Sequence, residues 1–402
     1  MTPNLINQFL NKKNYDVRLT GNARWIDQKC ALDSVCFVAD CILEYIRNGG
    51  GEPFHSPDIW KSEYAIQNVQ SWFGKPDPLR ETTLDEYNKF FRQPMKMLAA
   101  AGVLHEEKVG STIEFSIAEI DILEYIALRE RNSSEFLCLY IEKTLRDSGL
   151  WDSFATFLEE QTISSLVELK SKFSDFCIKY TPINTEVEAN RIFIKVLNPL
   201  ACKYHKKGIT RGQLSPSIIT FGAIMYNQPN WRDVYSGKDK NVARGDFDSS
   251  QLAPPLYEYK VSRAAKNLKR FNDKYNDGKS EILDKFSIGK IATHMHHIFP
   301  KYEFPEIADY IENLIAITSG QHLQCAHPNG NTRAIDKDYQ YNCLICKTES
   351  IRKNLIENHG ESVIYNFDDF MHVLDTGLSI EYFGHLANDD FDAVIQGIEF
   401  NF

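Results

Sequence analysis

The sequence predicts a mainly helical α+β protein made of more than one domain. The chain has 402 residues, enough for two or three domains, and 43% hydrophobic with 12% aromatic residues supply their cores. Most segments show apolar residues at helical spacing between capping residues and glycine or proline. Only short stretches carry the alternating or β-branched residues of strands.

Residues 30–118 predict helices followed by a β-hairpin. The first helix begins at Asp33, and Ser56-Pro57 opens another, with serine as N-cap and proline at the first helical position. Thr83-Leu-Asp-Glu86 is a capping box for a third helix. Pro94 is expected to kink or split that helix, because proline lacks the amide hydrogen that the helix needs. Two strands joined by a glycine turn complete the segment.

This order of elements resembles a winged helix-turn-helix domain, which we assign to residues 1–118. In that fold the third helix enters the DNA major groove and the hairpin lies on the backbone. The resemblance rests on element order. It implies DNA contacts from four side chains of the third helix, which are Lys89, Arg92, Gln93 and Lys96. A winged helix that contacts only other proteins is the alternative.

A middle region, residues 119–254, follows. Its first part is expected to be helical, because apolar residues recur at helical spacing. The part from Gly208 to Gly245 is rich in loop residues and mixes aromatic with basic side chains, including Trp231 and Arg232. Such a mixture can bind nucleic acid, or the aromatic side chains can pack within a linker, and the sequence leaves both open.

The densest chemical signal lies in the C-terminal region, residues 255–402. His294-Met-His296-His297 is followed by Asn313 and His322. One histidine of a pair can bind a metal while its neighbour stays free as a base, and another histidine can complete the metal site. This division of roles suits phosphodiester hydrolysis. A single histidine is usually structural, but a cluster of this density predicts a site.

The sequence around the histidines predicts a strand, a loop, a second strand and a helix. The first strand is expected over residues 288–297, since Pro300 cannot donate to a sheet ladder. The second covers residues 312–317, and Thr318 or Ser319 then caps the helix. Adjacent side chains of a strand point to opposite faces. The two neighbouring histidines can therefore share one ligand only if the strand ends or bends there.

Residues 287–347 resemble the HNH or ββα-metal endonucleases, close to their His-His variant. The resemblance implies a catalytic pair in which His297 is the general base that activates water and Asn313 fixes the loop between the strands. It also implies that His296 and His322 bind a Mg²⁺ or Mn²⁺ ion.

His327 is a candidate ligand for two different metals. It follows His322 by five positions, whereas a spacing of four would put both on one helix face, so its place in the catalytic site stays open. Some members of the superfamily that this segment resembles also carry a structural zinc. Here Cys325, Cys343 and Cys346 could bind one together with His327. Alternatively, Cys343 and Cys346 are small apolar residues of a helix.

The formal net charge of −10 does not favour a protein that coats DNA without specificity. A local basic face is enough for a specific enzyme. A run of lysines and arginines directly before the histidines supplies one, with Lys266 and Lys269 as the expected phosphate contacts. A solvated helix face is the alternative reading of this run.

The nine cysteines lie mostly in apolar helical contexts, which indicates reduced thiols rather than disulfides. The N-terminus lacks the basic and apolar regions of a signal peptide, and no apolar run is long enough to span a membrane. These features predict a cytoplasmic protein without a membrane partner.

A large recognition region joined to one nuclease module, without an ATP-binding motif, resembles a bacterial Type II restriction endonuclease of a restriction-modification system. The resemblance implies site-specific hydrolysis of double-stranded DNA to 5′-phosphate and 3′-hydroxyl ends. Two-fold symmetric sites would suit a homodimer. Two alternatives stay open: a nonspecific or modification-dependent defence nuclease, and a DNA-binding regulator whose nuclease module is inactive.

Overall fold

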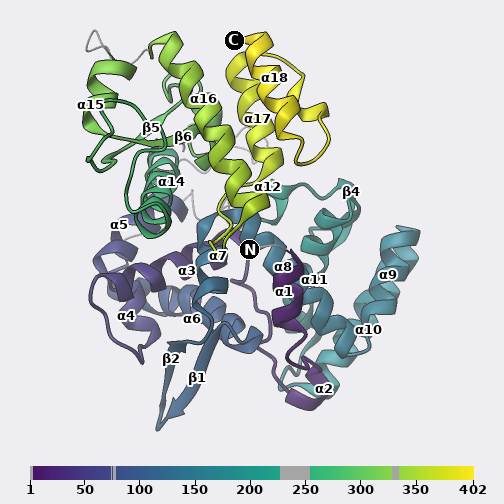
Figure 1. The fold of residues 1–402 in the computed structure, drawn as a ribbon. Helices are drawn as coiled ribbons and strands as arrows, with labels where there is room; N and C mark the ends of the chain where they lie inside the picture. The colour runs from purple at the N-terminus through teal and green to yellow at the C-terminus, as the bar shows by residue number, and fades with distance from the viewer. Residues whose placement is uncertain (1–2, 74, 76–77, 227–253, 328–334) are drawn as a thin grey trace, which may run out of the picture. The chain divides into compact units, whose positions relative to one another are not determined.

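The protein is mainly helical, with three two-stranded antiparallel sheets (Figure 1). The expected helical α+β class is therefore confirmed. The chain divides into two compact units, residues 1–249 and 250–402. The computed structural model describes residues 3–73, 75, 78–226, 254–327 and 335–402.

The first half of unit 1 contains the predicted helices and hairpin. Its elements are α1 (Pro3–Leu10), α2 (Val17–Thr20), α3 (Leu32–Arg47), α4 (Ser56–Trp60), α5 (Glu63–Phe73), the 3-10 turn η1 (Glu81–Thr83), α6 (Leu84–Ala101), β1 (Leu104–Val109) and β2 (Thr112–Ile117). β1 and β2 pair antiparallel, with Leu104 opposite Ile117 and Val109 opposite Thr112. A short bridge between Phe54 and Phe115 adds a third backbone segment to this hairpin.

α6 is one helix that runs through Pro94, so the expected split does not occur. Phe90, Phe91 and Met95 on either side of the proline are fully buried. Burial of such large apolar side chains stabilises the folded chain by about 1.5–3 kcal/mol each. Their packing outweighs the loss of the helical hydrogen bond that Pro94 cannot donate. The expected split took only that lost bond into account.

The second half of unit 1 is also helical. It comprises α7 (Ile120–Leu128), α8 (Glu130–Asp147), α9 (Trp151–Glu160), α10 (Ile163–Tyr180), α11 (Glu186–Lys203), β3 (Lys207–Thr210), β4 (Gln213–Ile218) and α12 (Phe221–Ile224). α3 is buried along most of its length and packs against α7 and α8. The structure therefore places the expected domain boundary at residue 118 inside one compact unit. Trp231 and Arg232 lie outside the described residues.

Unit 2 contains the predicted order of strand, loop, strand and helix. Its elements are α14 (Pro254–Tyr275), β5 (His294–His297), η4 (Pro305–Ile307), η5 (Ile311–Asn313), β6 (Leu314–Ile317), α15 (Ser319–Gln321), the π-helical turn η6 (His322–Ala326), α16 (Lys337–Arg352), the π-helical turn η7 (Lys353–Glu357), α17 (Phe367–Leu378), η8 (Phe383–His385) and α18 (Phe391–Asn401). β5 is shorter than expected, because residues 288–293 belong to a loop. Among the described helices, none combines the length and the apolar character that crossing a membrane requires.

Candidate metal centre

The two strands of unit 2 form the platform of the site. β5 and β6 pair antiparallel, with His296 opposite Ile315 and His297 opposite Leu314. All four residues of β6 are buried, so this strand anchors the pair in the core. Side chains alternate along a strand, so His294 and His296 share one face of β5, and His297 is the residue at which the strand ends.

The helix after β6 begins with a capping box. The Thr318 hydroxyl accepts a hydrogen bond from the Gln321 amide at 3.2 Å, and Gln321 Oε1 accepts one from the Thr318 amide at 2.9 Å. The helix then widens into the π turn η6, where the His327 amide donates to the His322 carbonyl at 3.1 Å. A π turn joins residues five apart and therefore brings His327 back beside His322.

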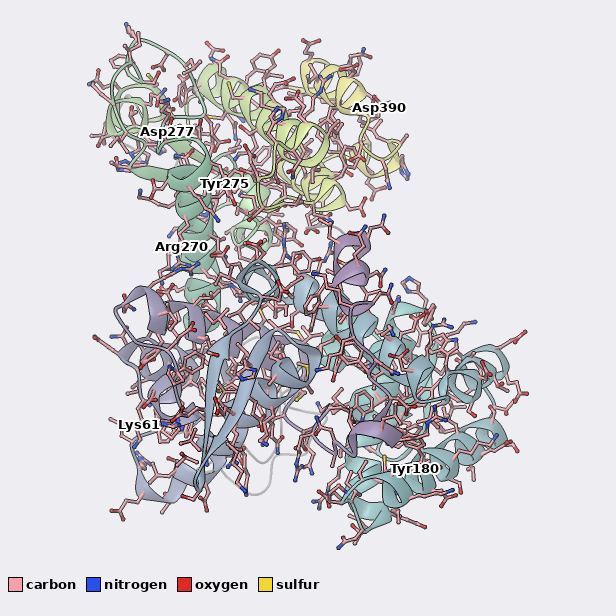
Figure 2. All side chains as sticks on the ribbon, turned by 60° about the horizontal axis from the view of Figure 1, so that its bottom comes forward. Lys61, Tyr180, Arg270, Tyr275, Asp277 and Asp390 are labelled. Carbon is pink, nitrogen blue, oxygen red and sulfur yellow. The ribbon has the colours of Figure 1, made fainter. Side chains whose placement is uncertain are left out.

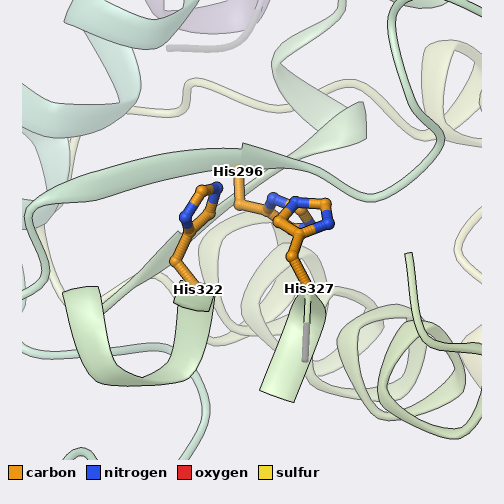
Figure 3. A group of neighbouring side chains, drawn as sticks. All are labelled: His296, His322 and His327. Carbon is orange, nitrogen blue, oxygen red and sulfur yellow. The ribbon is translucent and has the colours of Figure 1, made fainter. Parts of the chain in front are cut away.

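Three imidazoles from these elements converge on one point. One ring nitrogen each of His296, His322 and His327 lies within 4.8 Å of the others. The ring centroids of His296 lie 5.3 Å from His322 and 5.1 Å from His327. Figure 3 shows the three rings turned toward one another. The sequence identified these three residues, and the π turn decides that His327 belongs with the other two.

Two histidines of this group, His296 and His322, are held neutral. Burial and the neighbouring histidines lower the pKa of His296 to about 3 and that of His322 to about 4. His296 Nε2 and His322 Nδ1 are buried without a hydrogen-bond partner in the described protein. A buried polar atom without a partner costs about 1–3 kcal/mol, and a bound cation would satisfy both nitrogens.

The donor set fits a divalent metal that prefers nitrogen. Neutral imidazoles are ligands for Zn²⁺ and related transition ions, whereas Mg²⁺ prefers oxygen. Three such ligands carry no charge, so a bound ion would keep its full positive charge. The residues present therefore suit Zn²⁺ better than the expected Mg²⁺.

His294 lies beside this centre, although no role was predicted for it. Its ring is stacked on that of His322, with centroids 4.5 Å apart and an interplanar angle of 19°. Its Nδ1 lies 3.0 Å from the Thr293 hydroxyl. The alternation of side chains along β5 was the signal that could have revealed it, since His294 and His296 are two positions apart.

His297 is half-buried at the end of β5 and outside the triad. Its Nε2 lies 3.0 Å from the Ala308 carbonyl. A carbonyl oxygen only accepts hydrogen bonds, so Nε2 carries the proton and Nδ1 keeps a lone pair. Burial lowers the pKa of His297, with Lys301 adding to the effect and the Ala308 carbonyl opposing it. His297 is therefore a neutral base at pH 7.

Asn313 fixes the loop between the strands. The residue is fully buried, and its amide brackets the Phe299 backbone: Oδ1 accepts from the Phe299 amide at 2.8 Å, and Nδ2 donates to its carbonyl at 3.0 Å. Nδ2 also lies 3.3 Å from the Ile307 carbonyl. Asn313 is thus a positioning residue without access to a substrate.

The expected zinc cysteines do not assemble into a second group of this kind. Over the described residues, the histidine triad is the group of potential ligands that a metal could bridge. Cys343 and Cys346 lie on α16, and Cys343 is fully buried. Burial raises the pKa of Cys343 well above its usual value. These features match the alternative in which the two cysteines are apolar residues of a helix.

The four residues expected to contact DNA from the third helix all lie on α6 but differ in their surroundings. Lys89 and Arg92 are exposed. Gln93 Oε1 accepts from the Lys29 amide at 2.9 Å, and Lys96 pairs with Glu106 at 3.1 Å. They line a surface hollow of about 330 Å³ to which Arg24, Asp27, Asp85 and Asn88 also contribute.

The lysines of α14 are engaged within the protein. Lys269 pairs with Asp273 one helical turn later, with Nζ 2.8 Å from a carboxylate oxygen. Lys266 also has an interaction within the protein. Both lysines interact with other groups of the protein. The basic run before the histidines therefore resembles a solvated helix face more than a surface that binds phosphate.

Comparison of the chain with protein-family models, with curated proteins and with solved structures found no match.

Proposed function

We propose that unit 2 is a metal-dependent nuclease of the ββα-metal type that hydrolyses duplex DNA. The observation that carries the proposal is the convergence of His296, His322 and His327 on a strand–strand–helix unit with an unprotonated His297 Nδ1 at the strand end. Three ligands with an adjacent base are the parts that hydrolysis of a phosphodiester needs.

In this proposal His297 accepts the proton of the attacking water at Nδ1. The hydrogen bond from Nε2 to the Ala308 carbonyl orients the ring and stabilises the charge that it gains. Asn313 maintains the loop that carries this carbonyl. A metal ion on the three histidines would stabilise negative charge on the phosphate and on the leaving oxygen. The products would be a 5′-phosphate and a 3′-hydroxyl.

Unit 1 is proposed to recognise the DNA sequence as a winged helix-turn-helix. The order α3, α4–α5, α6 and hairpin supports this, as does the backbone bridge from Phe54 to Phe115 ahead of α4. Lys89 and Arg92 are the exposed cations of α6 and would face the major groove. Together with the nuclease this suggests a site-specific restriction enzyme, and two-fold symmetric sites would suit a homodimer.

Supercoiled plasmid incubated with the full chain tests the proposal. Zn²⁺, Mn²⁺ and Mg²⁺ are added separately to metal-depleted protein, with chelator and the His297→Ala variant as controls. Discrete cleavage products are expected with at least one of the ions. No cleavage is expected when a chelator is present. A smear would identify a nonspecific nuclease, and uncut plasmid with every ion would overturn the proposed activity.

A second function is favoured by the burial of the ligands. His296 and His327 are only 6% and 5% exposed. Structural metal sites are closed, whereas catalytic sites keep a position open to water or substrate. A DNA-binding regulator that uses the metal only to fold would show this burial. It would bind duplex DNA, contain the metal and leave plasmid uncut.

A further inference from the structure

The loop of residues 278–292 lies between α14 and β5 and carries features that the metal centre does not use. Arg270, Tyr275 and Asp277, labelled in Figure 2, mark the last turns of α14 and the start of this loop. The ends of the loop meet, because the Ala292 amide donates to the Gly278 carbonyl at 2.8 Å. Compact loops with closed ends often serve function.

The 278–292 loop is tied to the helix that carries His322. Gln321 Oε1 accepts from the Ser280 hydroxyl at 2.8 Å, and Gln321 Nε2 donates to the Ile282 carbonyl at 2.9 Å. The Thr318 hydroxyl donates to the Phe286 carbonyl at 3.2 Å. The loop therefore has a defined position beside the metal centre.

Large apolar side chains of this loop point to solvent. Leu283, Ile288 and Ile291 are 87%, 79% and 62% exposed. They line a surface hollow of about 530 Å³. Three such residues on one well-tied loop make no contribution to the core, and exposed apolar patches usually mark a contact surface.

Two lysines of the loop lack a carboxylate partner within the described part of the chain. Lys285 and Lys290 are exposed, and no described Asp or Glu lies within ion-pair distance of either. Lys279 differs, since its Nζ lies 2.9 Å from Asp277. The Asp284 carboxylate accepts the Phe286 and Ser287 amides through one oxygen, Oδ1. The apolar side chains thus stand beside two exposed cations, of which Lys285 lies over the Phe286 ring with Nζ 4.9 Å from the centroid.

Lys290 lies close to the metal-binding helix. A methyl group built on Gly320 would meet Phe286 at 3.6 Å and Lys290 Nζ at 3.9 Å. Gly320 precedes the ligand His322 by two residues. An anionic polymer that contacts Lys290 would therefore pass beside the triad.

We propose that the 278–292 loop is the surface through which unit 2 grips duplex DNA. The ammonium groups of Lys285 and Lys290 contact phosphates of the backbone, and Ile288 and Ile291 enter the minor groove, where apolar side chains can pack against sugars and base edges. The inference rests on the proposed function, and it names cations other than Lys266 and Lys269 as the phosphate contacts.

The two kinds of contact have different signatures in a salt series. Each phosphate contact releases counterions and contributes about 0.9 to the slope of log affinity against log salt, whereas an apolar contact contributes nothing to it. Binding of a fluorescent duplex is measured with full-length, zinc-loaded His297→Ala protein, so that the duplex stays uncut. The variants added to this background are Lys285→Ala/Lys290→Ala, Ile288→Asn/Ile291→Asn and, as the matched control on the same loop, Lys279→Ala.

The Lys285→Ala/Lys290→Ala variant should show a shallower slope of log affinity against log salt, by about 0.9 for each lysine removed. The Ile288→Asn/Ile291→Asn variant should bind the duplex about tenfold more weakly at every salt concentration, with the slope unchanged. Lys279→Ala should match the background. Circular dichroism and zinc content, unchanged in all variants, exclude misfolding as the cause.

A lysine-pair slope equal to that of Lys279→Ala overturns the inference, and plasmid cleavage by wild-type protein then leaves the nuclease function standing. If the wild type neither binds nor cuts DNA, both fail. If the isoleucine pair converts a dimer to a monomer and leaves DNA binding unaltered, the loop joins two copies of the chain, and the inference is again overturned.

Discussion

His297 and Asn313 flank one loop of unit 2, and their surroundings assign them different roles. His297 is half-buried, with an Nδ1 lone pair left available by the bond to the Ala308 carbonyl. Asn313 is fully buried and saturates its amide with backbone groups. The first can therefore act on a substrate, and the second can act only by holding the loop.

His297→Ala is expected to reduce the cleavage rate by about 10²–10⁴-fold, because it removes the proposed general base. DNA affinity and metal content should stay at the wild-type level, since His297 is outside the triad. Single-turnover cleavage and filter binding measure the two effects. His372→Ala, an exposed histidine of the same unit, is the control. A rate within tenfold of wild type would show that His297 is not the base.

Asn313→Ala is expected to lower the free energy of unfolding of unit 2 by about 2–4 kcal/mol. The substitution leaves the buried Phe299 amide and carbonyl without their partner, and each unsatisfied group costs about 1–3 kcal/mol. Urea unfolding measures the loss. Asn276→Ala is the matched control, because that side chain makes its hydrogen bonds at an exposed position. Equal effects of the two substitutions would contradict the role given to Asn313.

At the scale of elements, a buried ion pair attaches the β5–β6 platform to α16. Lys347 Nζ lies 2.7 Å from Glu281 and 3.0 Å from the Tyr365 hydroxyl. Glu281 also accepts the Ala316 amide of β6 at 2.8 Å. Lys347 is fully buried and Glu281 nearly so. Burial lowers the pKa of Lys347, and Glu281 opposes this effect.

Lys347→Met is expected to destabilise unit 2 by about 3–5 kcal/mol, because it leaves the Glu281 charge buried without its partner. The double variant Glu281→Gln/Lys347→Met should recover part of the loss, since it buries no charge. Urea unfolding of the two variants measures this difference. Lys279→Met, which removes an exposed pair, should change little. A double variant no more stable than the single one would contradict the assignment of the loss to an unpaired buried charge.

At the scale of the whole molecule, the chain separates a helical unit with two small two-stranded sheets from a unit that contains the histidine triad. The protonation of the triad is linked to the folding of unit 2. A cation bound to the folded triad would add stability in proportion to the logarithm of its concentration. Protonation of His296 and His322, whose pKa values are lowered in the folded chain, opposes folding and would compete with a bound cation.

Metal-depleted protein is expected to bind one equivalent of Zn²⁺ per chain, because the described residues bring three imidazoles together and no comparable group of cysteines. Calorimetric titration measures the stoichiometry. His322→Ala should abolish tight binding. Cys346→Ser should leave it unaltered. Two equivalents, with one lost in the cysteine variant, would restore the structural zinc expected from the sequence.

Stability of the metal-free protein is expected to fall as the pH drops below 6.5. Burial lowers the pKa of His296 from 6.5 to about 3, so the unfolded chain binds more protons in this window. The contribution is complete above pH 6.5 and is lost toward pH 3. The slope is on the order of 1 kcal/mol per pH unit. Urea unfolding at several pH values tests this. A slope unchanged in His296→Gln would contradict the assignment.

Local sequence was sufficient for the order of elements around the histidines and for singling out His296 and His322. Capping residues and glycines act within one helical turn, so the helix starts near Asp33, Ser56 and Thr318 and the order around the histidines could be predicted. These features depend on neighbours along the chain. The role of Asn313 in holding the loop was implied by a family resemblance instead, and its bonds to Phe299 join residues 14 positions apart.

Tertiary packing decided what the neighbours along the chain could not. α6 continues through Pro94 because its flanking apolar residues are buried, and residues 1–118 share a unit with α7 and α8 because α3 packs against both. The π turn carries His327 to the triad, where helical spacing alone left it undecided. The state of Lys269, paired with Asp273, likewise depends on the folded arrangement. Each of these outcomes depends on burial or on distances in the folded chain, which the local sequence pattern does not specify.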